Sequence, residues 1–220
     1  MNWRKLKKKI LELLSGRDFE KNLEEICRIP ARQAVNPLIS FFYSGDERLK
    51  WRAIAAMGQV VSGLACQDME SARLIMRRLL WNLNDESGGI GWGSPEAMGE
   101  IMAHSEKLAD EYSRMLISYI NPDGNYLEHE LLQRGSLWGV GRLAHARPDH
   151  AKDAAEYLPP FLKNQDPILR GLAAWAAIPI KSDTIKPVIK QLIDDKTKIR
   201  IFIDMDFVEF TTGQLARKSV

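Results

Sequence analysis

The chain has 220 residues, of which 45% are hydrophobic, so it can bury a substantial core as one large domain or one short repeat array. Its 31 Lys and Arg residues nearly balance 29 Asp and Glu residues, and the net charge of +2 excludes an overall field that draws the protein to nucleic acid or to an anionic membrane. Two cysteines are too few for a disulfide scaffold or a thiolate metal site, and a reducing cytoplasm fits best.

The N-terminal segment is a basic run, Arg4–Lys9, followed by a short apolar run that Glu12 interrupts. That apolar run is too short for the hydrophobic part of a signal peptide, and no small-residue cleavage site follows it. Nowhere does an uncharged apolar stretch approach the roughly 20 residues needed to cross a bilayer. We therefore expect a soluble, cytoplasmic protein with no membrane contact.

Apolar residues recur at helical spacing up to about residue 194, and helix-breaking residues divide this region at regular intervals. The pattern predicts helices of roughly 10–18 residues joined by short turns, arranged as helical hairpins. The breakers are Pro30, Gly45, the glycines of 88–93, the Pro-Asp-Gly at 122–124, Pro148, Pro167 and the Ser-Asp at 182–183.

Four segments of this region align on small residues and predict an internal repeat. They are WRAIAAMGQV at 51–60, WGSPEAMGEI at 92–101, RGSLWGVGRL at 134–143 and LRGLAAWAAI at 169–178. Gly58, Gly99, Gly141 and Ala176 fall in one column, roughly 35–42 residues apart, which is the period of a two-helix repeat. Small residues at these positions let neighbouring helices approach closely.

The segments DERLKWRAIAAMGQV and QDPILRGLAAWAAI resemble the second helix of HEAT repeats, in particular the short form associated with phycobilisome lyases. That pattern is Asp-x-x-x-Arg-x-x-Ala-x-x-Ala-Leu-Gly. The resemblance covers about residues 30–194 and implies an α-solenoid, but its family includes scaffolds, adaptors, chromophore-attachment proteins and related DNA glycosylases, so it implies no single function. The matching residues are Asp166, Arg170, Ala173 and Ala174, and more loosely Asp46, Arg52, Ala55, Ala56 and Gly58.

The C-terminal segment departs from the helical pattern. Alternating β-branched and aromatic residues at 199–203 and 207–211, separated by Asp204–Asp206, predict a β-hairpin, and the residues after it predict a short helix. The fold expected is therefore an all-α superhelix of HEAT-like repeats with a small C-terminal β-hairpin cap. We expect one domain over residues 1–220, with capping helices at 1–29, repeats at 30–194 and the hairpin and helix cap at 195–220.

The glycine-rich stretch DESGGIGWGSPEAMGEI, residues 85–101, lies between two predicted helices of one repeat. No Lys-Ser or Lys-Thr follows the glycines and no strand precedes them, which argues against a nucleotide-binding loop. We expect an inter-helix turn, with Ser94 as the N-cap, Pro95 at the first helical position and Glu96 in the first turn. A plain turn does not explain why glycine is so frequent here.

The aligned columns place side chains of neighbouring second helices side by side. Glu100 is expected to meet Arg142, and Glu96 is expected beside Trp138. One interpretation is an ion-pair ladder with a packed tryptophan. The other is a recognition groove on the concave face, formed by Glu96, Glu100, Trp138 and Arg142 and rimmed by Asp85, Glu86 and Trp92.

The remaining reactive residue types give no pattern for catalysis. The four histidines are scattered, neither cysteine has an adjacent histidine, and no Gly-x-Ser-x-Gly motif occurs, so no metal, cofactor or catalytic residue is expected. Core packing is the commoner role for a tryptophan inside a helical pattern, whereas one near the end of an element is more often exposed. The first group is Trp51, Trp81, Trp138 and Trp175, and the second is Trp3 and Trp92.

These observations favour a non-catalytic scaffold that binds a protein or peptide partner on its concave face. An alternative of another class is a helical-repeat enzyme similar to the alkylpurine DNA glycosylases, with Trp92, Glu96, Trp138 and Arg142 holding a base by analogy. The low net charge disfavours nucleic acid as a partner. A chromophore lyase is a third alternative, based on the repeat resemblance alone.

Overall fold

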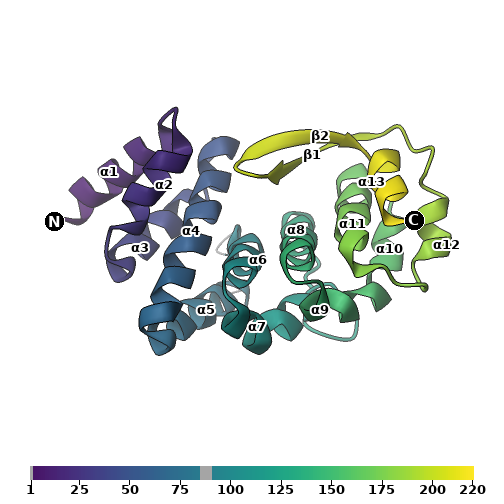
Figure 1. Ribbon diagram of the computed structural model, residues 1–220, viewed down its shortest axis with the longest axis horizontal. Coiled ribbons are helices and arrows are strands. Elements are labelled where there is room, and N and C mark those ends of the chain that lie inside the picture. The colour runs from purple at the N-terminus through teal and green to yellow at the C-terminus, as the bar shows by residue number, and fades with distance from the viewer. Residues whose placement is uncertain (1, 85–90) are drawn as a thin grey trace.

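A computed structural model describes residues 2–84 and 91–220, and it shows a helical chain that ends in a β-hairpin and a short helix (Figure 1). The helices are α1 (Trp3–Ser15), α2 (Phe19–Cys27), α3 (Ala31–Phe41), α4 (Glu47–Gln67), α5 (Met69–Leu83), α6 (Ser94–His104), α7 (Glu106–Ser118), α8 (Glu130–Ala146), α9 (Pro148–Ala151), the 3-10 helix η1 (Lys152–Glu156), α10 (Leu158–Leu162), α11 (Pro167–Ile180), α12 (Lys186–Lys190) and α13 (Thr212–Ser219). The strands are β1 (Lys198–Ile203) and β2 (Asp206–Thr211).

Helices α4, α6, α8 and α11 form a row in which each packs against the next, and we call them the concave row. They contain the four aligned sequence segments, apart from Trp92 and Gly93, which precede α6. Helices α5, α7 and α9 lie on one side of the row and the hairpin lies on the other (Figure 1). The alternation of inner and outer helices along the chain confirms the predicted α-solenoid.

Small residues bring the helices of the concave row into close contact. A Cβ atom added to Gly99 of α6 would lie 2.4 Å from the carbonyl oxygen of Gly139 in α8, a distance that no real side chain tolerates. Any larger residue would therefore push the two helices apart. This contact explains why the repeat alignment centres on glycine and alanine.

Helix starts follow local sequence signals. The side chains of Asp46, Ser105 and Asp166 each accept a hydrogen bond from a main-chain N–H in the first turn of α4, α7 and α11. Such bonds satisfy donors that have no partner within the helix. The same three residues therefore fix where the chain reverses between inner and outer helices.

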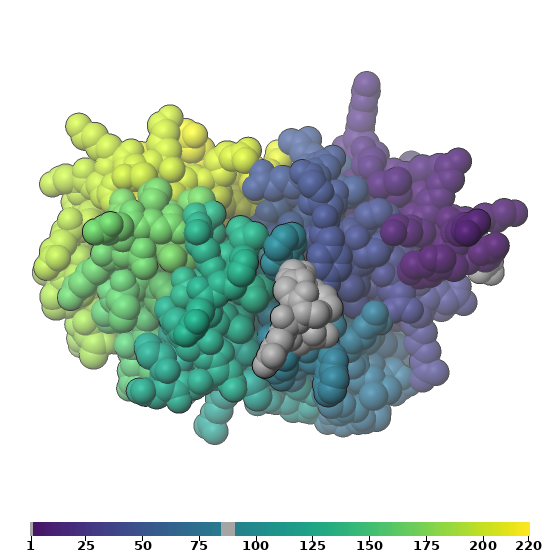
Figure 2. Space-filling view, turned by 180° about the vertical axis from the view of Figure 1, so that it is seen from behind, coloured from purple at the N-terminus to yellow at the C-terminus, as the bar shows by residue number. Residues whose placement is uncertain are grey.

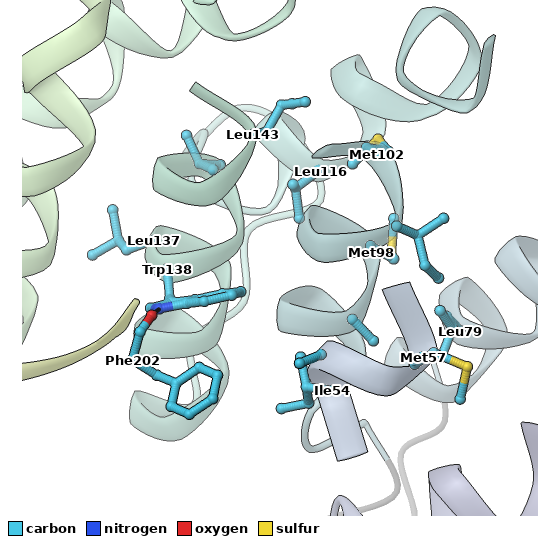
Figure 3. Close-up of a cluster of buried hydrophobic side chains, with 14 of the residues drawn as sticks. Ile54, Met57, Leu79, Met98, Met102, Leu116, Leu137, Trp138, Leu143 and Phe202 are labelled. Carbon is cyan, nitrogen blue, oxygen red and sulfur yellow. Dashed lines mark hydrogen bonds between the residues drawn. The ribbon is translucent and has the colours of Figure 1, made fainter. Parts of the chain in front are cut away.

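The hydrophobic core is continuous along the solenoid. Figure 3 shows its central part, where Ile54 and Met57 of α4, Met98 of α6 and Leu116 of α7 lie among buried side chains. Each inner helix thus shares one core with its neighbour and with the outer helix beside it. Shared burial of this kind is what holds a repeat array together. Among the helices described, none is long and apolar enough to span a bilayer.

The hairpin forms where the alternating sequence predicts it. Its antiparallel strands pair Lys198 with Thr211 at one end and Ile203 with Asp206 at the other. Asp204 and Met205 form the connecting turn, and both have positive φ angles, 50° and 67°, as the type I′ form of a two-residue hairpin turn requires. Helix α13 follows at once, and its first turn is closed by a capping box.

The hairpin does more than cover the last repeat. Helix α13 packs against α11 at the C-terminal end of the solenoid, whereas the hairpin crosses the concave row and reaches α4 (Figures 1 and 2). There Arg200 pairs with Glu47 at 2.7 Å, and Asp206 accepts from Arg48 at 3.5 Å. The hairpin is therefore a strap between the two ends of the row. The division of the chain at residues 29 and 194 stays a prediction.

Candidate functional site

The strap covers the concave row, and a cavity lies on each side of the strap. We name them the Lys50 pocket, of about 640 Å³, and the His104 pocket, of about 610 Å³. The Lys50 pocket lies toward the N-terminal ends of the inner helices and the His104 pocket toward their C-terminal ends. Both volumes fall within the range typical of ligand sites in proteins.

A stack of aromatic rings separates the two pockets. Phe202 of β1 stacks on Trp51 of α4 with ring centroids 5.4 Å apart, and Trp51 also contacts Trp138 of α8 at 4.6 Å. The indole N–H of Trp138 donates to the main-chain oxygen of Phe202 at 3.1 Å (Figure 3). The helical floor therefore holds the strand through both its side chain and its backbone.

A buried ion pair lies on the floor of the Lys50 pocket. Lys50 Nζ donates to Glu96 Oε1 at 3.0 Å, and the glutamate side chain is only 5% exposed. The carboxylate rests against Gly135 of α8, where a side chain would collide with it. Lys50 was not among the predicted residues. Its signal was its place in α4, just before Trp51, the residue aligned with Trp92.

A second buried carboxylate, Glu100, lies on the floor of the His104 pocket. Arg142 Nε donates to it at 2.7 Å, as the aligned columns predict, and His104 Nε2 lies 3.0 Å from its other oxygen. Burial acts to raise the pKa of Glu100, but the hydrogen bonds from His104 and Arg142 and the positive charge of Arg142 outweigh burial and lower the pKa. Glu100 is therefore held as a carboxylate.

The strap divides the residues predicted to form one groove. Trp92 and Glu96 line the Lys50 pocket, whereas Glu100 and Arg142 line the His104 pocket. Trp138 is 3% exposed beneath the strap, in keeping with a tryptophan packed in the core, and it lines both pockets. Asp85 and Glu86 lie outside the described residues. Whether the others bind a partner stays a prediction.

Two other expectations about tryptophans need correction. Trp81, expected in the core, is 73% exposed, because its position on α5 faces away from the concave row. Trp92, expected to be exposed, is half-buried and lines the Lys50 pocket. A helical pattern alone does not say which face of an outer helix is covered.

The turn before α6 explains part of the glycine-rich stretch. Gly93 has a φ of +79° and a Cβ atom there would lie 2.8 Å from Phe42, so both backbone conformation and space require glycine. The N-cap of α6 is this glycine, which corrects the expectation that Ser94 caps the helix. Ser94 is instead the first helical residue, and its buried hydroxyl has no hydrogen-bond partner among the described residues.

Neither pocket contains a set of metal ligands. Within residues 2–84 and 91–220, no group of three or more His, Cys, Asp or Glu side chains could hold a metal ion. His145, in the His104 pocket, stacks on Trp175 and its Nε2 lies 3.1 Å from the Trp175 carbonyl oxygen. Burial lowers the pKa of His145, and the nearby Arg142 and Lys218 act in the same direction.

No family model matches the chain. An uncharacterized protein of Archaeoglobus fulgidus is 29% identical over 137 residues, which make up 62% of this chain and 64% of that protein. The match therefore spans less than two thirds of the relative's length.

Two solved structures are similar to this chain over nearly its whole length. An engineered protein covers 100% of it with a TM-score of 0.56 at 17% identity, and the match spans 95% of that protein. A designed armadillo repeat protein in complex with the peptide (KR)4 covers 96% of it with a TM-score of 0.54 at 15% identity, and the match spans 96% of that protein. At these identities the likeness concerns the fold. The chain has the fold of the armadillo-type helical repeats.

Proposed function

We propose that this protein is a non-catalytic scaffold that binds an extended segment of a partner protein in the Lys50 pocket. The observation that carries the proposal is that the concave row already holds one extended strand, β1, by the Trp138 hydrogen bond to the Phe202 backbone. A pocket lined by the same strand and by aromatic side chains lies beside it. The designed armadillo protein of similar fold is itself in complex with a peptide, which agrees with this use of the fold.

The charges of the concave row give no support to nucleic acid as the partner. Lys50 is paired with Glu96, Arg142 with Glu100, and Arg134 with Asp166 at 3.0 Å. Binding of a duplex requires several cations free to neutralise phosphates. The proposed partner is therefore protein. We place the scaffold in the cytoplasm, because Cys27 and Cys66 are both free and exposed, as a reducing compartment allows.

The test is selection of binders from a displayed library of short random segments, followed by calorimetry with the best synthetic peptide. Leu131 lines the Lys50 pocket and is 47% exposed, so Leu131→Arg blocks the pocket without disturbing the core. We expect this variant to weaken binding about tenfold or more, equivalent to about 1.4 kcal/mol. Leu74→Arg is the matched control, because Leu74 is 57% exposed on α5 and lines neither pocket.

Two results would contradict the proposal. The first is a library that yields no segment binding the wild-type chain. The second is a selected segment whose affinity is lowered equally by Leu131→Arg and Leu74→Arg, because the Lys50 pocket would then have no special part in binding.

A further inference from the structure

We propose that the partner segment binds as an added β-strand, hydrogen-bonded to the free edge of β1 at Arg200 inside the Lys50 pocket. This inference rests on the proposed function and specifies its binding mode and the chemistry of the partner. Main-chain pairing to a free strand edge is one of the recurring ways in which proteins bind extended segments. Three features of the described residues lead to it.

The first feature is the direction of the main-chain groups of β1. In an antiparallel pair, residues alternate between bonding to the partner strand and pointing away from it. The N–H of Thr212 donates to the oxygen of Thr197, so Ile199 and Ile201, at even spacing from Thr197, bond to β2. The N–H and C=O of Arg200 then point to the outer edge of β1.

The bond from Trp138 confirms this assignment independently. Phe202 lies two residues after Arg200, so the main-chain groups of both residues point to the same edge of β1. The oxygen of Phe202 accepts from the Trp138 indole on the side of β1 away from β2. The outer edge at Phe202 is thus occupied. Among the described residues, no hydrogen bond reaches the main-chain N–H or C=O of Arg200, or those of Lys198 two residues earlier, which leaves these two as the open positions on this edge.

The second feature is the position of that edge. Five consecutive residues of β1, 198–202, line the Lys50 pocket, as expected when a strand presents its edge rather than one face. The helical wall of the pocket includes the apolar side chains of Leu131 in α8 and Ile168 in α11, together with Trp92 in the turn before α6. A segment added here would place alternate side chains against this wall. Its backbone would lie along Arg200.

The third feature is charge. Every charged side chain that lines the Lys50 pocket is already in an ion pair among the described residues, in the pairs Lys50–Glu96, Arg200–Glu47, Lys198–Glu209 and Arg134–Asp166. An added charge of either sign would lose water without gaining a free partner. The complementary occupant is therefore an extended, uncharged segment with apolar side chains. The basic peptide (KR)4 does not meet this description.

The experiment is a methylation scan of the peptide selected in the preceding subsection. Each main-chain amide in turn is N-methylated, and the affinity for the wild-type chain is measured by calorimetry. Strand pairing requires the N–H of alternate residues only. We expect methylation of the amides that pair with Lys198 and Arg200, which lie two residues apart in the peptide, to weaken binding about tenfold. Methylation at the position between them should change binding less than about threefold.

A variant of the protein tests the same bond from the other side. Arg200→Pro removes the outward N–H, which β1 does not use to pair with β2, and proline is tolerated at such edge positions. Arg200→Gln is the control, because it also removes the ion pair with Glu47 but keeps the N–H. We expect the proline variant to bind about fivefold to tenfold more weakly than the glutamine variant, with equal thermal stability.

The outcomes separate this inference from the proposed function. A peptide that binds and is blocked by Leu131→Arg, but shows no alternation in the scan, overturns strand pairing and leaves the scaffold function in place. Failure to select any peptide overturns both. If Arg200→Pro unfolds the hairpin, the scan still decides, because it uses the wild-type chain. Selected peptides rich in Lys and Arg, or in Asp and Glu, would overturn the inference about charge.

Discussion

The indole N–H of Trp138 donates to the main-chain oxygen of Phe202, a residue 64 positions further along the chain. This bond fixes the strap to the middle of the concave row. It also places the Phe202 ring against Trp51, so that side-chain burial and backbone hydrogen bonding act at one point. The strap is consequently a part of the folded core.

Truncation of Phe202 should show how strongly the strap is held. Phe202 is 5% exposed, and Phe202→Ala removes its burial and its stacking on Trp51. We expect a loss of about 3 kcal/mol in the free energy of unfolding. The measurement is denaturant unfolding followed by circular dichroism. Val208→Ala, on a residue of β2 that is 39% exposed, should cost less than about 0.5 kcal/mol, and equal losses in the two variants would mean that the strap is not docked.

Alanine substitution should change stability in opposite directions at two glycines, Gly93 in the turn before α6 and Gly63 in α4. Gly93→Ala combines an unfavourable positive φ with a collision against Phe42, and we expect a loss of about 2 kcal/mol. Gly63→Ala, in the exposed part of α4 with no atom within 4 Å of the new methyl group, should instead gain about 0.5–1 kcal/mol. Thermal melting of both variants checks the difference in sign. Stabilisation by Gly93→Ala would contradict this account of the turn.

The ion pair between Glu100 and Arg142 should be costly to break from one side. Arg142→Ala leaves the buried Glu100 with His104 as its remaining partner, and because Arg142 is itself 28% exposed we expect a loss of about 2 kcal/mol. The double variant Arg142→Ala with Glu100→Gln should recover part of that loss, since no unpaired carboxylate remains. Denaturant unfolding of the four proteins of this cycle measures the coupling. If the losses in unfolding free energy of the two single variants add up to the loss of the double variant, the pair has no coupling energy.

Acid should weaken the fold through the same carboxylate. The pKa of Glu100 is lowered in the folded protein, so the unfolded chain binds its proton more readily. The resulting stabilisation is present above the pKa of the unfolded chain and is lost as pH falls through the lowered pKa. We expect the free energy of unfolding of the wild type to fall more steeply between about pH 5 and pH 3 than that of Glu100→Gln. Parallel curves for the two proteins would contradict this assignment.

Features that depend on one helix or on the repeat period could be predicted from the sequence. The small-residue column gave the register in which Glu100 meets Arg142, because neighbours in a stack of equal units follow from alignment alone. The alternation at 199–203 and 207–211 likewise predicts the two strands. Both signals are local or strictly periodic.

The position of the strap could not be predicted in this way. The contacts of Arg200 with Glu47 and of Phe202 with Trp51 join the hairpin, which follows the last inner helix in the chain, to α4, the first inner helix. They depend on how the helices stack in three dimensions. Nothing in the sequence near Trp138 indicates that a strand covers it. The groove predicted from the columns is therefore two pockets, and the contribution of Lys50 became visible only with the fold.

The strap also limits how this architecture can vary. In an open solenoid, units can be inserted or deleted because each unit interacts only with its neighbours. Here one short hairpin, anchored beside α11, must reach Glu47 and Arg48 at the start of α4, so its length is matched to the number of inner helices beneath it. An inserted unit would carry α4 beyond the tip of the hairpin. The chain is therefore a solenoid of fixed size, in which a strand six residues long sets the number of units.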